Sequence, residues 1–108
     1  MIQSFSIIIE KLKNKMLVGI CKFAIYLPNC HSLKDKRSIL ESYKISLRKK
    51  YNISISEIGQ KNLWKNRIIG IYSIGDDRQL MDQIVDKIIK DTEKHPEIQL
   101  QNYQISIN

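Results

Sequence analysis

The fold is decided by residues 16–50, which read MLVGICKFAIYLPNCHSLKDKRSILESYKISLRKK. Residues 16–27 are mostly apolar at both odd and even positions, and a proline ends the run. This pattern is typical of a well-buried central strand. Ser32, with Asp35 three residues later, is a variant of the capping box, and apolar residues follow at helical spacing. The segment therefore predicts a central strand and then a helix over about residues 33–50.

The next segment predicts a hairpin. Asn52 is expected to close the helix in a left-handed conformation, and residues 53–58 alternate in the period-two pattern of a strand. A polar segment then separates this strand from a second β-rich run, Arg67 to Ile74. Two such runs so close in sequence are expected to pair with each other.

The remaining residues predict a second helix and a last strand. Asp76 and Asp77 can cap a helix, whose apolar stripe continues to about Lys94 and which a proline then stops. Residues 98–107 alternate with a one-residue phase shift near Asn102. Such a shift indicates a β-bulge in the final strand.

The predicted order is therefore βαββαβ. Each βαβ half crosses over right-handedly, which places both helices on the same side of the sheet. The sequence predicts an α+β, ferredoxin-like two-layer sandwich, with two helices on one face of a four-stranded antiparallel sheet. Residues 16–108 are expected to form this single domain.

Residues 1–15 form an N-terminal extension in which an apolar run, Phe5 to Ile9, precedes the charged residues. A signal peptide has the opposite order. We expect either a start-site artefact or frayed extension, with translation beginning at Met16, or a short amphipathic helix that touches a membrane surface or a partner.

Composition narrows the function classes. In 108 residues there is no run of about 18–20 apolar residues that could span a membrane. Cys21 and Cys30 match no zinc spacing, which suits a reduced cytoplasmic protein. The four glycines form no phosphate cradle, and His31 and His95 both lie beside helix ends. We expect a protein that is not an enzyme and that uses no metal or cofactor.

The charge is unevenly distributed. The chain carries a formal net charge of +7, and residues 31–50 hold seven basic against two acidic residues, a net charge of +5. Residues 76–97 hold seven acidic and four basic residues. Such a basic helix attracts polyanions. The alternative is that both helices simply have solvated faces, which help each other across a shared seam.

The candidate anion site is the start of the first helix. Lys34, Lys36 and Arg37 crowd a turn where the helix dipole favours negative charge, which suggests that a phosphate binds there. Trp64 either folds back on the core or stacks on a nucleobase. The predicted nucleic-acid or anion-binding residues are Ser32, Lys34, Lys36, Arg37, Arg48, Lys49, Trp64 and Lys65.

The sheet face without helices is the second candidate surface. Apolar residues occur at both parities of the third strand and also in the first. An uncovered apolar face of that size is unusual on a monomer. We therefore expect a homodimer, or another protein partner, at the open face.

Two segments resemble a known family: residues 31–37, HSLKDKR, and residues 56–64, SEIGQKNLW. Together they are similar to the YlxP-like family, a bacterial domain family of unknown function. The resemblance covers residues 16–108 and implies a ferredoxin-like fold, no known enzymatic activity and a role around ribosomal RNA. The chain departs from the family pattern at Asn62, where Asp is expected, and at Lys65, where Gln is common.

Three hypotheses follow. The first is a non-enzymatic RNA-associated or ribosome-associated binding protein, whose partner is ribosomal RNA or a ribosomal subunit. The second is a homodimeric protein-interaction module with no nucleic-acid role. The third is an anion- or metabolite-binding domain that uses the turn of residues 31–37.

Overall fold

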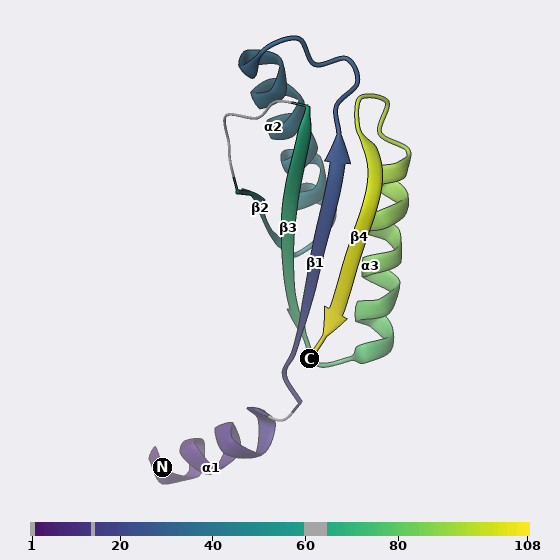
Figure 1. Cartoon of the computed structure of the whole chain (residues 1–108). Coiled ribbons are helices and arrows are strands. Elements are labelled where there is room, and N and C mark those ends of the chain that lie inside the picture. The colour runs from purple at the N-terminus through teal and green to yellow at the C-terminus, as the bar shows by residue number, and fades with distance from the viewer. Residues whose placement is uncertain (1, 14, 60–64) are drawn as a thin grey trace.

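The computed structural model describes residues 2–13, 15–59 and 65–108, and the side chains of residues 2, 3 and 13 are not described. The elements in chain order are α1 (Ile2–Lys13), β1 (Leu17–Tyr26), α2 (Leu33–Lys50), β2 (Ser54–Ile58), β3 (Asn66–Gly75), α3 (Arg78–Glu93) and β4 (Gln99–Ile107). Figure 1 shows the sheet on one side of the domain with α2 and α3 behind it.

The four strands form one antiparallel sheet in the order β2-β3-β1-β4. The order of core elements is βαββαβ, which together with this strand order is the ferredoxin-like arrangement. The predicted α+β fold is therefore confirmed. β1 lies at the centre, as its apolar residues at both parities predict.

The register separates two faces of the sheet. Phe23 of β1 lies between Ile69 of β3 and Tyr103 of β4, and its side chain is fully buried under the helices. Ala24 pairs with Asn102, whereas Ile25 pairs with Leu100, so one residue of β4 is left over. This irregularity confirms the predicted bulge near Asn102.

Helices α2 and α3 both begin at the predicted capping residues, but α2 does not end as predicted. Ser32 Oγ accepts a hydrogen bond from the Asp35 amide at 3.0 Å, and Asp77 caps α3 in the same way. The prediction that Asn52 closes α2 in a left-handed conformation is wrong. No described residue other than glycine has a positive φ, and Tyr51 leaves the helix in an extended conformation.

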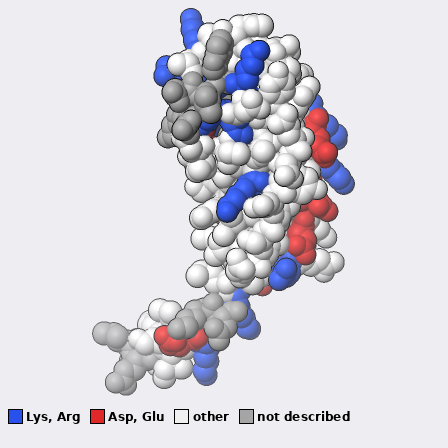
Figure 2. Space-filling model, in the orientation of Figure 1, with Lys and Arg blue, Asp and Glu red and all other residues white. Residues whose placement is uncertain are grey.

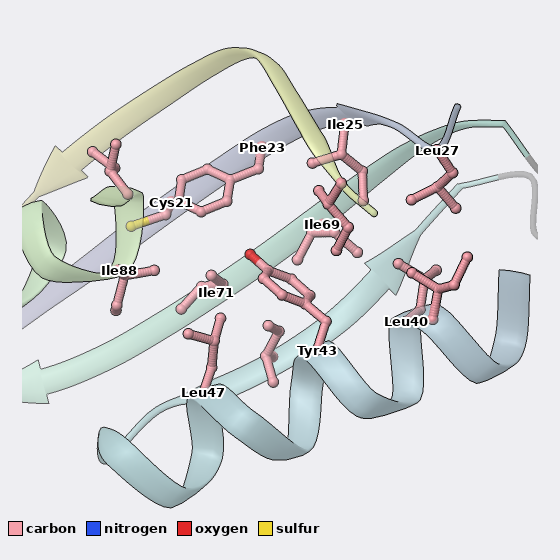
Figure 3. Packing of buried hydrophobic residues seen from close by; sticks show 14 of the residues in the cluster. Cys21, Phe23, Ile25, Leu27, Leu40, Tyr43, Leu47, Ile69, Ile71 and Ile88 are labelled. Carbon is pink, nitrogen blue, oxygen red and sulfur yellow. The ribbon is translucent and has the colours of Figure 1, made fainter. Parts of the chain in front are cut away.

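The core lies between the helices and the covered face of the sheet. Figure 3 shows side chains of α2, such as Leu40 and Leu47, meeting Ile69 and Ile71 of β3, while Ile88 enters from α3. The Tyr43 ring lies among these apolar groups with its hydroxyl directed inward. The core therefore joins both helices to the central strands.

Tyr43 brings one polar pair into this core. Its hydroxyl lies 2.7 Å from Thr92 Oγ1, and Thr92 Oγ1 donates to the Ile88 carbonyl at 2.8 Å. Because the Thr92 hydrogen is used there, the Tyr43 hydroxyl donates to Thr92 Oγ1. The pair links α2 to α3 inside the core.

His95 packs against the same tyrosine just beyond α3. Its ring meets the Tyr43 ring edge-on at 5.8 Å, and its Nδ1 accepts a hydrogen bond from the Glu97 amide at 3.1 Å. Burial lowers the pKa of His95 below its ordinary value, although the nearby Glu97 acts in the opposite direction.

The N-terminal residues form helix α1, which projects away from the domain (Figure 1). Its apolar side chains, including Phe5 and Ile9, are exposed. No helix in the described ranges has the length and apolarity needed to cross a bilayer.

We predict an asymmetric result for the hydroxyl pair. Thr92→Val leaves the buried Tyr43 donor without an acceptor and should lower the free energy of unfolding by about 1–3 kcal/mol, whereas Tyr43→Phe should lower it by about 1 kcal/mol. In the Tyr43→Phe background Thr92→Val should be milder, because no donor is then stranded. Urea unfolding of the two single variants and the double variant measures this coupling, and additive effects would contradict it.

We also predict a pH dependence from His95. Since its folded-state pKa is lowered, the unfolded chain binds more protons between that pKa and about 6.5. Stability should therefore fall as pH decreases through this window. Thermal unfolding at a series of pH values should show a flatter profile for His95→Gln than for the control His31→Gln, and equal profiles would contradict the assignment.

Candidate nucleic-acid interface

The rotation of α2 decides which of its basic residues face solvent. Ile39, Leu40, Tyr43 and Leu47 are buried against the sheet. The opposite side of the helix carries four of the predicted contacts, all of them exposed: Lys34, Arg37, Arg48 and Lys49. The sequence therefore assigned these four to the surface correctly.

Lys36 lies on the other side of the helix, inside the protein. Only 3% of the residue is exposed, and its Nζ lies 3.2 Å from Glu57 Oε2. Arg67, equally buried, donates from Nε to the same Glu57 oxygen at 2.9 Å and from a terminal nitrogen to the Ile58 carbonyl at 3.1 Å. The prediction of Lys36 as a surface phosphate contact is therefore corrected, because the ammonium is buried and paired with a carboxylate of the same chain.

The periodicity of the sequence predicts that these charged groups are buried, although a count of charges along α2 does not. Glu57 has the same parity as Ile55 in a strand of period two, so its carboxylate must face the core. Lys36 lies three and four residues before buried Ile39 and Leu40, on the same helical stripe. Periodicity alone therefore places both groups inside.

The first turn of α2 already holds a negative charge. Ser32 Oγ binds the Asp35 amide, and Asp35 Oδ2 accepts from the His31 amide at 3.0 Å. The carboxylate thus sits where the helix dipole favours it. The expectation that three cations crowding this turn suggest a bound phosphate is corrected for Lys36, which is paired, and Asp35 supplies an anion of the chain itself.

The last turn of α2 contacts neighbouring elements. Arg48 donates to the Ile55 carbonyl at 3.3 Å, although the residue remains exposed. Lys50 Nζ lies 3.4 Å from Asp91 Oδ2 of α3, and the Tyr51 hydroxyl donates to that oxygen at 2.6 Å. This hydrogen bond lowers the pKa of Asp91, with a further contribution from Lys50. A polar contact thus links the two helices here.

Lys65 is exposed immediately before β3. Its carbonyl accepts a hydrogen bond from the Leu27 amide at 2.8 Å, so it lies beside the end of β1, from which the chain leads to α2. Trp64 falls outside the described residues, and its role stays a prediction.

These contacts bring basic residues to one end of the molecule. The Lys36–Glu57 pair ties the start of α2 to the end of β2, and Lys65 lies close by, immediately before β3. Five basic residues (Lys34, Lys36, Arg37, Lys65, Arg67) stand here against Asp35 and Glu57, a net charge of +3. Figure 2 shows basic groups gathered at this upper end, whereas the side where α3 runs carries acidic and basic groups together.

The described residues contain no group of three or more His, Cys, Asp or Glu side chains that could hold a metal ion. Cys21 and Cys30 are both buried, and burial raises the pKa of the Cys21 thiol to about 11. That thiol stays protonated at neutral pH.

We predict that Glu57 is required for stability. Glu57→Gln removes the carboxylate that binds both Lys36 and Arg67, and should lower the free energy of unfolding by about 3–5 kcal/mol. Lys36→Met should lower the free energy of unfolding by a smaller amount, because Glu57 keeps its ion pair with Arg67. The control is Glu41→Gln, which breaks a surface helix pair between the exposed Glu41 and the half-buried Lys44 and should change stability by less than about 0.5 kcal/mol. Equal effects in urea unfolding at positions 41 and 57 would contradict the prediction.

Comparison with known proteins places the chain in a family. Its structure is similar to two de novo designed proteins, Foldit4 (TM-score 0.48, 86% of this chain and 93% of the design) and Ferredog-Diesel (TM-score 0.40, 84% and 83%), each at 11% sequence identity. Its sequence is 30% identical over 79 residues to the uncharacterized protein YlxP of Bacillus subtilis (strain 168), covering 73% of this chain and 84% of that protein. The model of a family described as "Protein of unknown function (DUF503)" matches residues 18–105. The resemblance drawn from the two motifs is thus confirmed, and the chain belongs to the DUF503 family.

Proposed function

We propose that this chain is a non-enzymatic RNA-associated or ribosome-associated protein that binds a phosphate backbone with the outward face of α2 and with Lys65. The observation that carries the proposal is a set of exposed cations without carboxylate partners. Lys34, Arg37, Lys49 and Lys65 are all exposed, and none makes an ion pair within the part of the chain that the structure describes. A polyanion can use such charges without breaking internal contacts.

The length of this surface suits a nucleic acid. Lys34 and Lys49 are fifteen residues apart on one face of a helix, or about 22 Å, over which a duplex presents on the order of ten phosphates. The small side chains of Ser38 and Ser42 lie exposed between the two basic ends, so a backbone can approach the helix closely.

The chemistry favours reading of phosphates over reading of bases. The candidate contacts are lysine and arginine side chains, which position a protein on a backbone but carry little sequence information. Ribosomal RNA, free or in a ribosomal subunit, is a partner of this kind. Trp64 is the candidate for stacking on an unpaired base.

The test is RNA binding by neutralised variants. Wild-type protein should bind ribosomal RNA fragments with an affinity that falls steeply with salt, because binding releases counterions. The triple variant K34Q/R37Q/K65Q should bind at least tenfold more weakly at low salt. It should also reduce the slope of log affinity against log salt by about 3, roughly 1 for each phosphate that the variant no longer neutralises.

The matched control is R78Q/K87Q/K90Q, which removes the same charges from the exposed side of α3. This control variant should keep most of the affinity for RNA and most of the slope of log affinity against log salt. An equal loss in both variants would show a general charge effect, and absence of binding by the wild type at low salt would refute the proposal. Co-sedimentation with ribosomal subunits, abolished in the α2 variant only, would identify the ribosome as the partner.

A further inference from the structure

The face of the sheet opposite the helices is apolar along β1 and β3. Because Phe23, Ile69 and Ile71 point into the core, the alternate residues of these strands point outward. On β3 these are Ile68, Tyr72 and Ile74, with 42%, 55% and 66% of their surface exposed. Their partners in β1 are smaller or half-buried side chains: Ala24, Ile20 and Val18.

This face carries almost no charge. Lys22 is the one ionisable basic side chain among its described strand residues, and no Asp or Glu is among them. Figure 2 shows the same face as a largely uncharged surface, in contrast with the side where α3 runs. Recognition here must therefore depend on apolar contact and shape.

The face also has a hollow that matches one of its own side chains. Ala24 lies in register between Ile68 of β3 and Asn102 of β4, and its small side chain leaves a depression. The depression has a volume of about 230 Å³, and its lining includes Lys22, Ala24, Ile68 and Gln104. An isoleucine side chain fits within that volume.

The available area is sufficient for a dimer. β1 has ten residues, about 33 Å at roughly 3.3 Å per residue, and four strands spaced about 4.8 Å apart span about 19 Å. Two such faces in contact would bury about 1,000–1,200 Å², which lies at the lower limit for specific interfaces.

We propose that two copies of this chain pair face to face through their open sheets. The two-fold axis runs along the strands between β1 and β3, so that β3 of each copy lies over β1 of the other. Ile68 of each copy then fills the hollow over the second copy's Ala24, and Tyr72 lies over Ile20. Each large exposed side chain of β3 thus meets a smaller or half-buried side chain of β1 in the second copy.

The same axis explains how the single charge is accommodated. Lys22 pairs in register with Gly70, so the proposed axis puts Lys22 of each copy above the glycine of the other. Gly70 has no side chain of its own, and the Ile58 side chain of β2 lies against it, so the lysine stem can pack along Ile58 toward the edge of the interface. The Lys22 ammonium groups of the two copies can then reach solvent at opposite edges of the interface.

This pairing is independent of RNA binding. The helices and the basic face of α2 lie on the opposite layer, so a sheet-to-sheet dimer leaves them uncovered (Figure 1). Failure of either proposal leaves the other standing.

The experiment is the mass in solution of the full chain by sedimentation equilibrium. One chain has a mass of 12.7 kDa, so a dimer of about 25 kDa is expected at tens of micromolar. Ala24→Tyr fills the hollow without adding charge, and Tyr72→Glu with Ile74→Glu charges the apolar stripe. Each of these two variants should raise the dissociation constant of the dimer at least tenfold and so favour the monomer. The control is Leu80→Glu, a comparably exposed apolar site on α3, which should stay dimeric.

Three outcomes would overturn the proposal. A wild-type monomer at 100 micromolar excludes the dimer, and so does a wild-type melting temperature that ignores protein concentration, since a dimer stabilises by mass action. A dimer that survives the face variants but dissociates in Phe5→Glu with Ile9→Glu would assign the contact to α1. Circular dichroism of each variant confirms that it is folded before its mass is interpreted.

Discussion

The ion cluster of Glu57, Lys36 and Arg67 is the contact on which the arrangement of the surface depends. Charges in a protein interior are tolerated only when their partners are fixed, because desolvation is expensive. Glu57 is held in a strand and binds both cations, so it favours the rotation of the first turn of α2 that buries Lys36. That rotation turns Lys34 and Arg37 outward.

The cluster also gives a physical meaning to the two segments on which the family resemblance was based. Lys36 belongs to the segment HSLKDKR and Glu57 to SEIG, and these two residues, 21 positions apart in sequence, are joined at 3.2 Å in the structure. A motif such as HSLKDKR reads at first as a basic binding sequence. Its second lysine is structural, and Lys34 and Arg37 are its exposed groups.

Sequence periodicity predicted nearly all of the fold, because each element has a clear pattern and the right-handed crossover leaves few topologies. Even the bulge in β4 was visible as a phase shift near Asn102. The end of α2 was not predictable in this way: Asn52 tolerates a left-handed conformation, but Tyr51 leaves the helix extended and its amide still bonds the Leu47 carbonyl. For the candidate site, counting charges on α2 placed Lys34 and Lys49 correctly and failed for Lys36, because a count ignores which face of a helix a residue occupies.

The two layers of the domain offer different kinds of interaction: the helix layer offers electrostatic attraction, and the open sheet offers apolar contact. The helix layer has charged outer faces, basic on α2 and mixed on α3, where four acidic residues stand against three basic ones. On the open face, by contrast, the described strands carry one lysine on an otherwise neutral surface. Electrostatic attraction acts over about 8 Å at physiological salt and can select a polyanion from a distance, while apolar contact acts only at short range and needs matching shapes. If the sheets pair as proposed, the two copies turn their α2 faces in opposite directions. One dimer would then hold two separate RNA segments, and it could not clamp a single one between its basic faces.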